Sequence, residues 1–514
     1  MENTDAIVMD AGHLDELLNR VLPFGWVENL PDGSKRFITD HSGSISFYYA
    51  QANGRVYSGK TPLEVAQQLN STEFDPISVA DFLVNGTVCF PHTVFKNVFA
   101  IPPGSVTEVS PHEVIVNQYF RPEEVNGYGD SAYWGGRLYE EVQKVLTVGL
   151  EGKSNIKVLF SGGEDSRAIT SLLPKDLSVE LVTFADGYNR EIRLAEHAAR
   201  VLGRPLRFVK RPEGFYRKEI ADRVRVIGGG FDIRRTHVWG PLADSLANAD
   251  AVVGGYAADT LFKSAWMGNV SRNKISLAPE RLLKETPSAP VGIKSEIGSA
   301  WLNKELATAV NDQRLAHHAR IQEFRPRTAG NWHTLWPLGT QRITYAHYLA
   351  ARRASPTLVE PFLGPQVYQV AAQMPDEMRV DRKAFRAAFG KAMGKAGWLP
   401  SSSGRIPRIG GYTGRAIELG VLASRRMQDR VARLNSHATG KPFVNQGAWS
   451  SDRPGFDEPL DQLLSPAQIE QLRDTMADIL TNDALHALFG GAGKAYAPPI
   501  VHNRALQIAY LIKT

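Results

Sequence analysis

The spacing of apolar residues divides the chain into an amino-terminal part rich in short strands and a longer part in which strands and helices alternate. Over residues 36–59, the apolar runs RFIT, SISFYYA and RVYSG are separated by DHSG and by ANG. Asparagine and glycine tolerate turn conformations that most residues resist, so this spacing predicts short strands joined by turns. Residues 90–120 continue the pattern around a Pro-Pro-Gly turn, and 61–69 read as a short helix. We therefore expect a small antiparallel β-rich domain over 1–122.

A polar, glycine-bearing stretch at 121–134 marks the expected domain boundary. Beyond it, three short apolar runs end in glycine: 156–163, 178–187 and 249–259. Helical periodicity occupies two segments in the same part: 136–150 and 190–203. Residues 236–253 are expected to lead into the third run as a helix. This alternation predicts a parallel α/β sheet with helices on both faces. From about residue 270, helical segments dominate and no clear strand is visible, so 123–514 are expected to form one α/β domain with a helical carboxy-terminal extension.

Composition and charge exclude several classes of protein. The 514 residues are 43% apolar and 22% charged, which excludes a disordered, collagen-like or coiled-coil chain. The net charge of +5, from 59 basic and 54 acidic residues, is far from the dense stripe of a nucleic-acid binder. The single cysteine, Cys89, excludes an internal disulfide and a cysteine-based zinc site. The acidic start and the lack of any apolar run near about 20 residues predict a soluble, cytoplasmic protein.

A phosphate-binding motif follows the first glycine-ended run. The sequence VLFSGGEDSR, residues 158–167, ends a strand in two glycines and begins a helix at once. Glycine lets the backbone approach an anion closely, and a helix start presents unpaired N–H groups and the positive end of its dipole. Ser161 and Ser166 can add hydroxyl donors, and Asp165 can bind a Mg²⁺ that holds phosphate. The motif lacks the lysine of the GxxxxGK[ST] loop.

This loop resembles the pyrophosphate-binding loop, SGGxDS, of the N-type ATP pyrophosphatases, which cleave ATP between the α- and β-phosphates. The sequence GGYAADTLF (254–262) is similar to the second signature of the asparagine synthetase B-like family, and nearer still to the GYGxD form of β-lactam synthetase. Residues 359–382 resemble the family's PFLD stretch, and RIPRIGGYTG (405–414) resembles its basic loop R-P-K-x-G.

The amino-terminal part also resembles this family. Residues 38–69 and 85–109 are similar to late strands of its glutaminase-type domain. Asparagine synthetases carry a glutamine-hydrolysing cysteine at position two of that domain, where this chain has Glu2. The domain is also shorter by most of its first half. The resemblance therefore implies a truncated, inactive glutaminase-like domain followed by an ATP-pyrophosphatase (synthetase) domain.

The family reaction implies an AMP-forming carbon–nitrogen ligase with ATP and Mg²⁺ as cofactors. A substrate carboxylate attacks the α-phosphorus of ATP, and an amine then attacks the acyl-adenylate to form an amide. The residues implied to bind ATP are Leu159, Phe160, Ser161, Gly162, Gly163, Asp165, Ser166, Thr183, Phe184 and Gly255. Asp165 and Asp259 are implied to bind Mg²⁺.

The resemblance also assigns residues to the reacting centre. Tyr256 would lie beside the reacting amine. Arg408, where the family has a lysine, would stabilise the pyrophosphate. An arginine keeps the charge but cannot give up a proton. No acidic residue stands at the expected place of the partner of Tyr256, so His347 and Glu360 are the two candidate bases.

Three functions remain open at this point. Without a glutaminase, the amine is expected on the substrate itself or on a second molecule. Macrolactam closure of a peptide, as in lasso peptide cyclases of antibiotic biosynthesis, is favoured, because arginine-rich segments at 190–193, 232–237 and 423–435 can meet an acidic peptide; they are also compatible with solvated helix faces. The alternatives are a small-molecule lactam or amide synthetase and a non-catalytic nucleotide-binding partner subunit. The expected partners are the substrate and a precursor peptide, leader-binding protein or protease, without a membrane or a nucleic acid.

Overall fold

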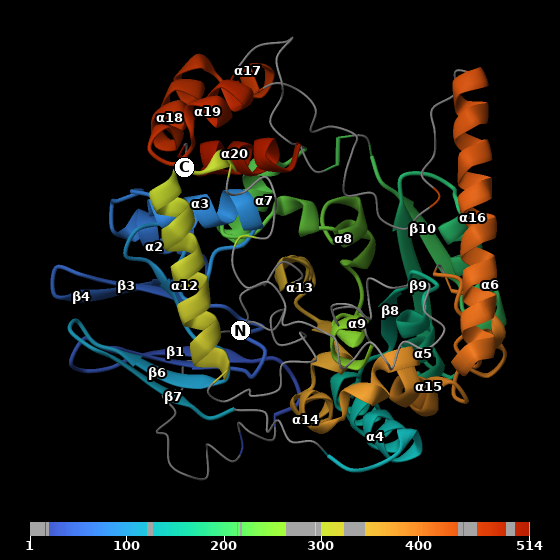
Figure 1. Ribbon diagram of the computed structural model, residues 1–514. Helices are drawn as coiled ribbons and strands as arrows, with labels where there is room; N and C mark the ends of the chain where they lie inside the picture. The colour runs from blue at the N-terminus through green and yellow to red at the C-terminus, as the bar shows by residue number, and fades with distance from the viewer. Residues whose placement is uncertain are drawn as a thin grey trace.

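Two kinds of sheet organise the chain (Figure 1). The computed structural model describes residues 16, 20–120, 127–212, 214–215, 218–263, 293, 300–322, 345–401, 403–439, 446, 460–489 and 499–512. Antiparallel sheets occupy the amino-terminal part, a five-stranded parallel sheet follows, and helices dominate beyond it. This confirms the expected mixed α/β architecture with a helical carboxy-terminal region.

The amino-terminal part consists of two antiparallel sheets. The first has the order β1-β2-β6-β7, from β1 (Gly25–Asn29), β2 (Lys35–Thr39), β6 (Ser105–Val109) and β7 (Val114–Gln118). The second has the order β4-β3-β5, from β3 (Tyr48–Ala52), β4 (Arg55–Gly59) and β5 (Phe99–Ala100). Buried side chains from both sheets pack in one cluster: Phe37, Phe47, Val56, Ile101 and Val109. The predicted strands are thus confirmed, and they form a small sandwich.

Local chemistry explains the turns and helices of this part. Asn53 and Gly54 adopt positive φ angles of 51° and 67° in the ANG turn between β3 and β4. At DHSG, one carboxylate oxygen of Asp40 accepts hydrogen bonds from the backbone N–H groups of Ser42 and Ser44, at 2.8 and 3.1 Å. This turn carries the chain from the first sheet to the second. Two helices follow: α2 (Pro62–Gln68), as predicted, and α3 (Pro76–Asn85).

The five-stranded sheet that follows the two antiparallel sheets is parallel throughout. Its order is β10-β9-β8-β11-β12, from β8 (Asn155–Leu159), β9 (Ser178–Ala185), β10 (Leu206–Lys210), β11 (Ala251–Val253) and β12 (Leu358–Val359). The helices of this part are α4 (Ser131–Gly149), α5 (Glu164–Leu172), α6 (Arg190–Leu202), α7 (Ile220–Ile227), α8 (Pro241–Leu246) and α9 (Ala258–Phe262). Helices α5 and α6 pack against β8, β9 and β10. The strand order reverses between β8 and β11, which is where open parallel sheets bind ligands.

Two expectations about this part are wrong. Strand β12 lies beyond residue 270, where no strand was expected; it is only two residues long and forms because it pairs with β11. The segment 236–253 is not one helix leading into β11, because α8 covers only Pro241–Leu246 and a turn follows it. Short elements of this kind depend on their tertiary partners more than on periodicity.

The carboxy-terminal region is helical, as expected. Its helices are α12 (Lys304–Gln322), α13 (Tyr345–Ala354), α14 (Pro365–Gln373), α15 (Lys383–Phe389), α16 (Gly411–Thr439), α17 (Leu460–Leu463), α18 (Pro466–Ala477), α19 (Asn482–Phe489) and α20 (Pro499–Ile512). The long helix α16 runs along the outer edge beside α6 (Figure 1). Among the described residues, no helix combines the length and apolar character needed to cross a bilayer.

Buried cations join the carboxy-terminal helices to the amino-terminal part. Helices α12 and α20 both pack against α3. Arg314 of α12 donates from Nε to Asp81 Oδ1 at 2.7 Å and from Nη2 to the carbonyl oxygen of Thr87 at 3.0 Å. Arg504 of α20 donates to the carbonyl oxygen of Leu83 at 2.7 Å. The two parts are therefore fastened together, although the expected boundary near residue 122 lies outside the described residues.

Replacing Arg314 with methionine is expected to lower the free energy of unfolding by about 3–5 kcal/mol, because Asp81 would stay buried without its cation. Denaturant unfolding of the full chain measures this change. The matched control is R225M, which removes an exposed ion pair with Asp222 and should change the free energy by less than about 1 kcal/mol. Similar small changes in both variants would contradict the fastening role of Arg314.

Candidate active site

A cavity of about 570 Å³ lies at the carboxyl ends of β8, β9 and β11, where the strand order reverses. Its size and position are those of a small-molecule site. Twelve residues expected from the sequence line it: Leu159, Phe160, Ser161, Asp165, Ser166, Thr183, Phe184, Gly255, Tyr256, Asp259, His347 and Glu360. Gly162 and Gly163 form the loop between two of these lining segments, whereas Arg408 does not line the cavity.

The glycine loop is held in a shape that only glycine allows. Gly162 has a φ of 69°, and a methyl group there would lie 2.8 Å from the Cα of Ala195 on α6. Helix α5 begins directly after its N-cap residue Gly163, which has no side chain to cap it and donates its own N–H to Ser161 Oγ at 3.2 Å. Its first N–H groups therefore remain available at the edge of the cavity that Asp165 and Ser166 line. This arrangement suits an anionic ligand.

Two carboxylates meet at this end of the cavity because β8 and β11 are neighbours in the sheet. Asp165 follows β8 and Asp259 follows β11, and the ammonium of Lys263 pairs with both, lying 2.8 Å from Asp259 Oδ1. Burial raises the pKa of Asp165 to about 6, whereas Lys263 lowers the pKa of Asp259. No group of three or more candidate metal-binding side chains occurs among the described residues. A pair of carboxylates nevertheless fits Mg²⁺ that arrives with substrate phosphates.

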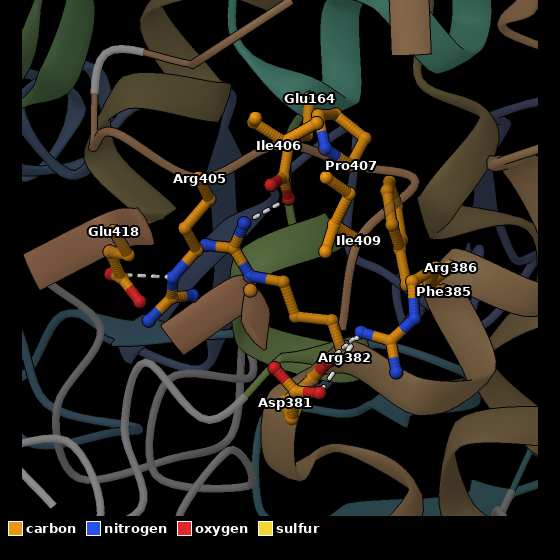
Figure 2. A pocket seen from close by; sticks show the side chains of 11 residues that line it. Glu164, Asp381, Arg382, Phe385, Arg386, Arg405, Ile406, Pro407, Ile409 and Glu418 are labelled. Carbon is orange, nitrogen blue, oxygen red and sulfur yellow. Dashed lines mark hydrogen bonds and ion pairs between the residues drawn. The ribbon is translucent and has the colours of Figure 1, made fainter. Parts of the chain in front are cut away.

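A network of ion pairs holds the start of α5, directly after the glycine loop (Figure 2). Glu164, the first residue of α5, pairs with Arg382, and Figure 2 shows this contact beside the 2.7 Å hydrogen bond from Arg405 Nε to Glu418 Oε1. Although burial opposes the charged form, Arg382 and Lys263 lower the pKa of Glu164. Glu164 therefore stays ionised and ties the start of α5 to the segment around Arg382.

Arg408 is placed differently from the other expected residues. Its side chain is exposed, and its guanidinium lies over the ring of Trp398, 5.2 Å from the centroid. Lys263 and Arg382 lie next to the loop, and neither was expected from the sequence. Lys263 is the residue directly after α9 and follows Asp259 by four positions, a spacing that brings two side chains together at a helix and is a signal for this pair.

Glu360 is the acidic residue that reaches Tyr256. Its Oε2 accepts a hydrogen bond from the backbone N–H of Tyr256 at 2.8 Å. Glu360 directly follows β12, so the pairing of β12 with β11 brings it to this position. A side chain at Gly254 would clash with its carboxylate. Burial raises the pKa of Glu360 from 4.5 to about 8.

His347 lies farther along the same wall, on α13. Its ring is 6.2 Å from that of Tyr256 and 5.2 Å from that of His237, between centroids. Burial lowers the pKa of His347 to about 4, and burial also lowers the pKa of His237. Both imidazoles are therefore neutral near pH 7. Both candidate bases thus line the cavity, and Glu360 makes the direct hydrogen bond to Tyr256.

Part of the chain is similar to a protein family. Residues 154–231 match a protein family of unknown function, DUF7411. The matched stretch includes the glycine loop and the β9 wall of the cavity. No curated protein matches the chain.

Glu360 should make stability fall with rising pH. Its pKa is raised in the folded chain, so the folded state holds a proton that the unfolded state releases between pH 4.5 and about 8. Relative to E360Q, the wild-type free energy of unfolding should fall across this range by at most roughly 5 kcal/mol. Denaturant unfolding of both proteins at several pH values measures the difference. Parallel pH profiles would refute the shifted pKa.

Proposed function

We propose that the protein is an ATP-dependent, AMP-forming carbon–nitrogen ligase with a synthetase domain of the ATP-pyrophosphatase type. One observation carries the proposal. A single cavity contains an anion-binding loop at a helix start, a carboxylate pair suited to Mg²⁺, and a buried acid hydrogen-bonded at Tyr256. These are the parts needed for phosphate binding and for removing a proton from an amine.

The nucleotide would lie along the ends of β8 and β9. Its phosphates would meet the N–H groups at the start of α5 and the hydroxyl of Ser166, and its adenosine would lie against Phe160 and Phe184. When bound, Mg²⁺ would neutralise charge on the phosphate oxygens, with Asp165 and Asp259 as its protein ligands. Lys263 and Arg382 supply positive charge beside Glu164 and Asp165 at the start of α5.

In the proposed reaction, an oxygen of the substrate carboxylate attacks the α-phosphorus and the bond to pyrophosphate breaks. The amine nitrogen then attacks the carbonyl carbon, and the carbon–oxygen bond to AMP breaks. The amine gives up a proton in this step, and we assign Glu360, whose carboxylate accepts a hydrogen bond from the backbone N–H of Tyr256, to receive it beside Tyr256. A Glu360 pKa near 8 suits this role, because the carboxylate is then a stronger base than an ordinary one.

Arg235 gives the opposite part of the cavity an affinity for carboxylates. Arg235 is one of the residues that line the cavity, and no ion pair is found for its guanidinium among the described residues. The two neighbouring histidines are neutral, so neither adds positive charge beside this guanidinium. A guanidinium binds a carboxylate with two parallel hydrogen bonds. We therefore assign the acid substrate to this end.

The pairing of the arginine-rich segments bears on the choice between a peptide substrate and a small-molecule substrate. Arg190 pairs with Asp429 at 3.0 Å, and Arg234 pairs with Asp232. In two of the three segments, an arginine is therefore already paired with an acidic residue of the same chain. Helix α16 still exposes Arg426 and Arg430, and macrolactam closure of a peptide now depends on that surface. The internal pairs favour the second candidate, a small-molecule lactam or amide synthetase whose whole substrate lies in the cavity.

Product analysis tests the ligase proposal. The protein is incubated with ATP, Mg²⁺ and either acidic peptides with a free amino terminus or small amino acids. With one of these two substrate classes, we expect AMP, pyrophosphate and an amide product that is lighter than its substrates by one water. D165N should abolish the formation of all three. The matched control D222N changes an exposed acid outside the cavity and should retain activity.

Other outcomes contradict the proposal. ADP and phosphate as products, or AMP that persists in D165N, would exclude the assigned chemistry. Nucleotide binding without turnover of any substrate would favour the non-catalytic partner subunit.

Arg235 should control the affinity for the acid substrate. We expect R235Q to raise KM for the acid by roughly 10- to 100-fold, because one charge-assisted hydrogen-bonding group is lost. KM for ATP should stay within about twofold of the wild-type value. Steady-state release of pyrophosphate measures both values. R225Q, at an exposed arginine away from the cavity, is the control. An equal rise in both KM values would show that Arg235 does not bind the acid.

A further inference from the structure

Lys263 occupies the space between the two carboxylates that are assigned to Mg²⁺. Its Nζ lies 2.8 Å from Asp259 Oδ1, pairs directly with Asp165 Oδ1, and is 3.9 Å from Glu164 Oε2. The ring of Phe385 covers the ammonium at 4.7 Å from its centroid. The lysine side chain is only 4% exposed, although Asp259 is 61% exposed. The ammonium is thus enclosed, and the carboxylate that it holds opens to the cavity.

We propose that Lys263 is the resident cation of the Asp165–Asp259 pair, and that a divalent metal ion occupies this pair only by displacing the ammonium. The inference takes from the proposed function only that these two carboxylates are metal ligands. An enclosed ammonium is stable here because it is paired on several sides. A metal ion that entered beside it would meet like charge at close range.

Charge balance explains when the displacement occurs. Three carboxylates, of Glu164, Asp165 and Asp259, face the ammonium of Lys263 and the guanidinium of Arg382. A free divalent ion that displaced the ammonium from Asp165 and Asp259 would leave it, among these three carboxylates, only Glu164, which already pairs with Arg382. A metal ion that arrives on phosphates brings new oxygens, and the ammonium can then bind these. Metal occupancy is thereby made conditional on an anionic ligand.

Binding of Mn²⁺ to the nucleotide-free full chain tests this inference. Electron paramagnetic resonance of free Mn²⁺ measures the dissociation constant for wild type, K263M and the double variant K263M/D165N. We expect K263M to bind one Mn²⁺ at least about tenfold more tightly than wild type, because a neighbouring positive charge is removed. The double variant should lose the gain. K157M, which removes another buried lysine that pairs with Glu180 at 3.7 Å, should behave as wild type.

The remaining outcomes overturn the inference. Equal Mn²⁺ affinity in wild type and K263M would mean that the ammonium does not compete with metal. No Mn²⁺ binding by folded K263M would mean that the pair is not a metal site and that Lys263 is purely structural.

A thermal measurement covers the case in which K263M folds poorly. The unfolding midpoint of K263Q should then rise with added MgCl₂ while that of the wild type does not, and equal shifts would refute the competition. Neither readout uses ATP or turnover, so a failed ligase assay would leave this result standing.

Discussion

The pairing of β8 with β11 is the constraint on which the candidate active site depends. The two strands are far apart in the chain but run parallel in register, with Val158 opposite Val253. Both therefore end at the same edge of the sheet, and the loops that follow them bring Asp165 and Asp259 together. Two carboxylates at one edge repel each other unless a cation lies between them. The position of Lys263, and the metal chemistry inferred for the pair, both follow from this adjacency.

A buried carboxylate also connects the site to the carboxy-terminal half of the chain. Glu164 lies at the start of α5, and its carboxylate pairs with Arg382, from a segment more than two hundred residues later. Arg382 has a left-handed backbone, with a φ of 56°, which is unusual for arginine and is held by these contacts. The contact between Glu164 and Arg382 therefore ties the start of α5 to the region after β12.

Periodicity and turn chemistry predicted much of the fold, and tertiary pairing decided the rest. The helix over 190–203 and the glycine that ends it at Gly203 were predictable, because both depend on residues within one or two turns. Strand β12 was not predicted, because two residues carry no periodic signal. Arg408 was selected from a motif position, yet its guanidinium lies over Trp398 outside the cavity. A motif gives the residue type at a position but not the direction of its side chain.

The sequence by itself determined the local chemistry of the site. Glycines that allow a left-handed loop, a helix that begins at once, and acidic residues after two strands are properties of short segments. The tertiary structure alone decided which groups meet. It placed Glu360 rather than His347 in direct contact with the Tyr256 backbone, and it put the ammonium of Lys263 between the carboxylates. These contacts join distant segments, and burial there shifts the pKa values on which the proposed chemistry depends; neither distance nor burial is encoded in a run of neighbouring residues.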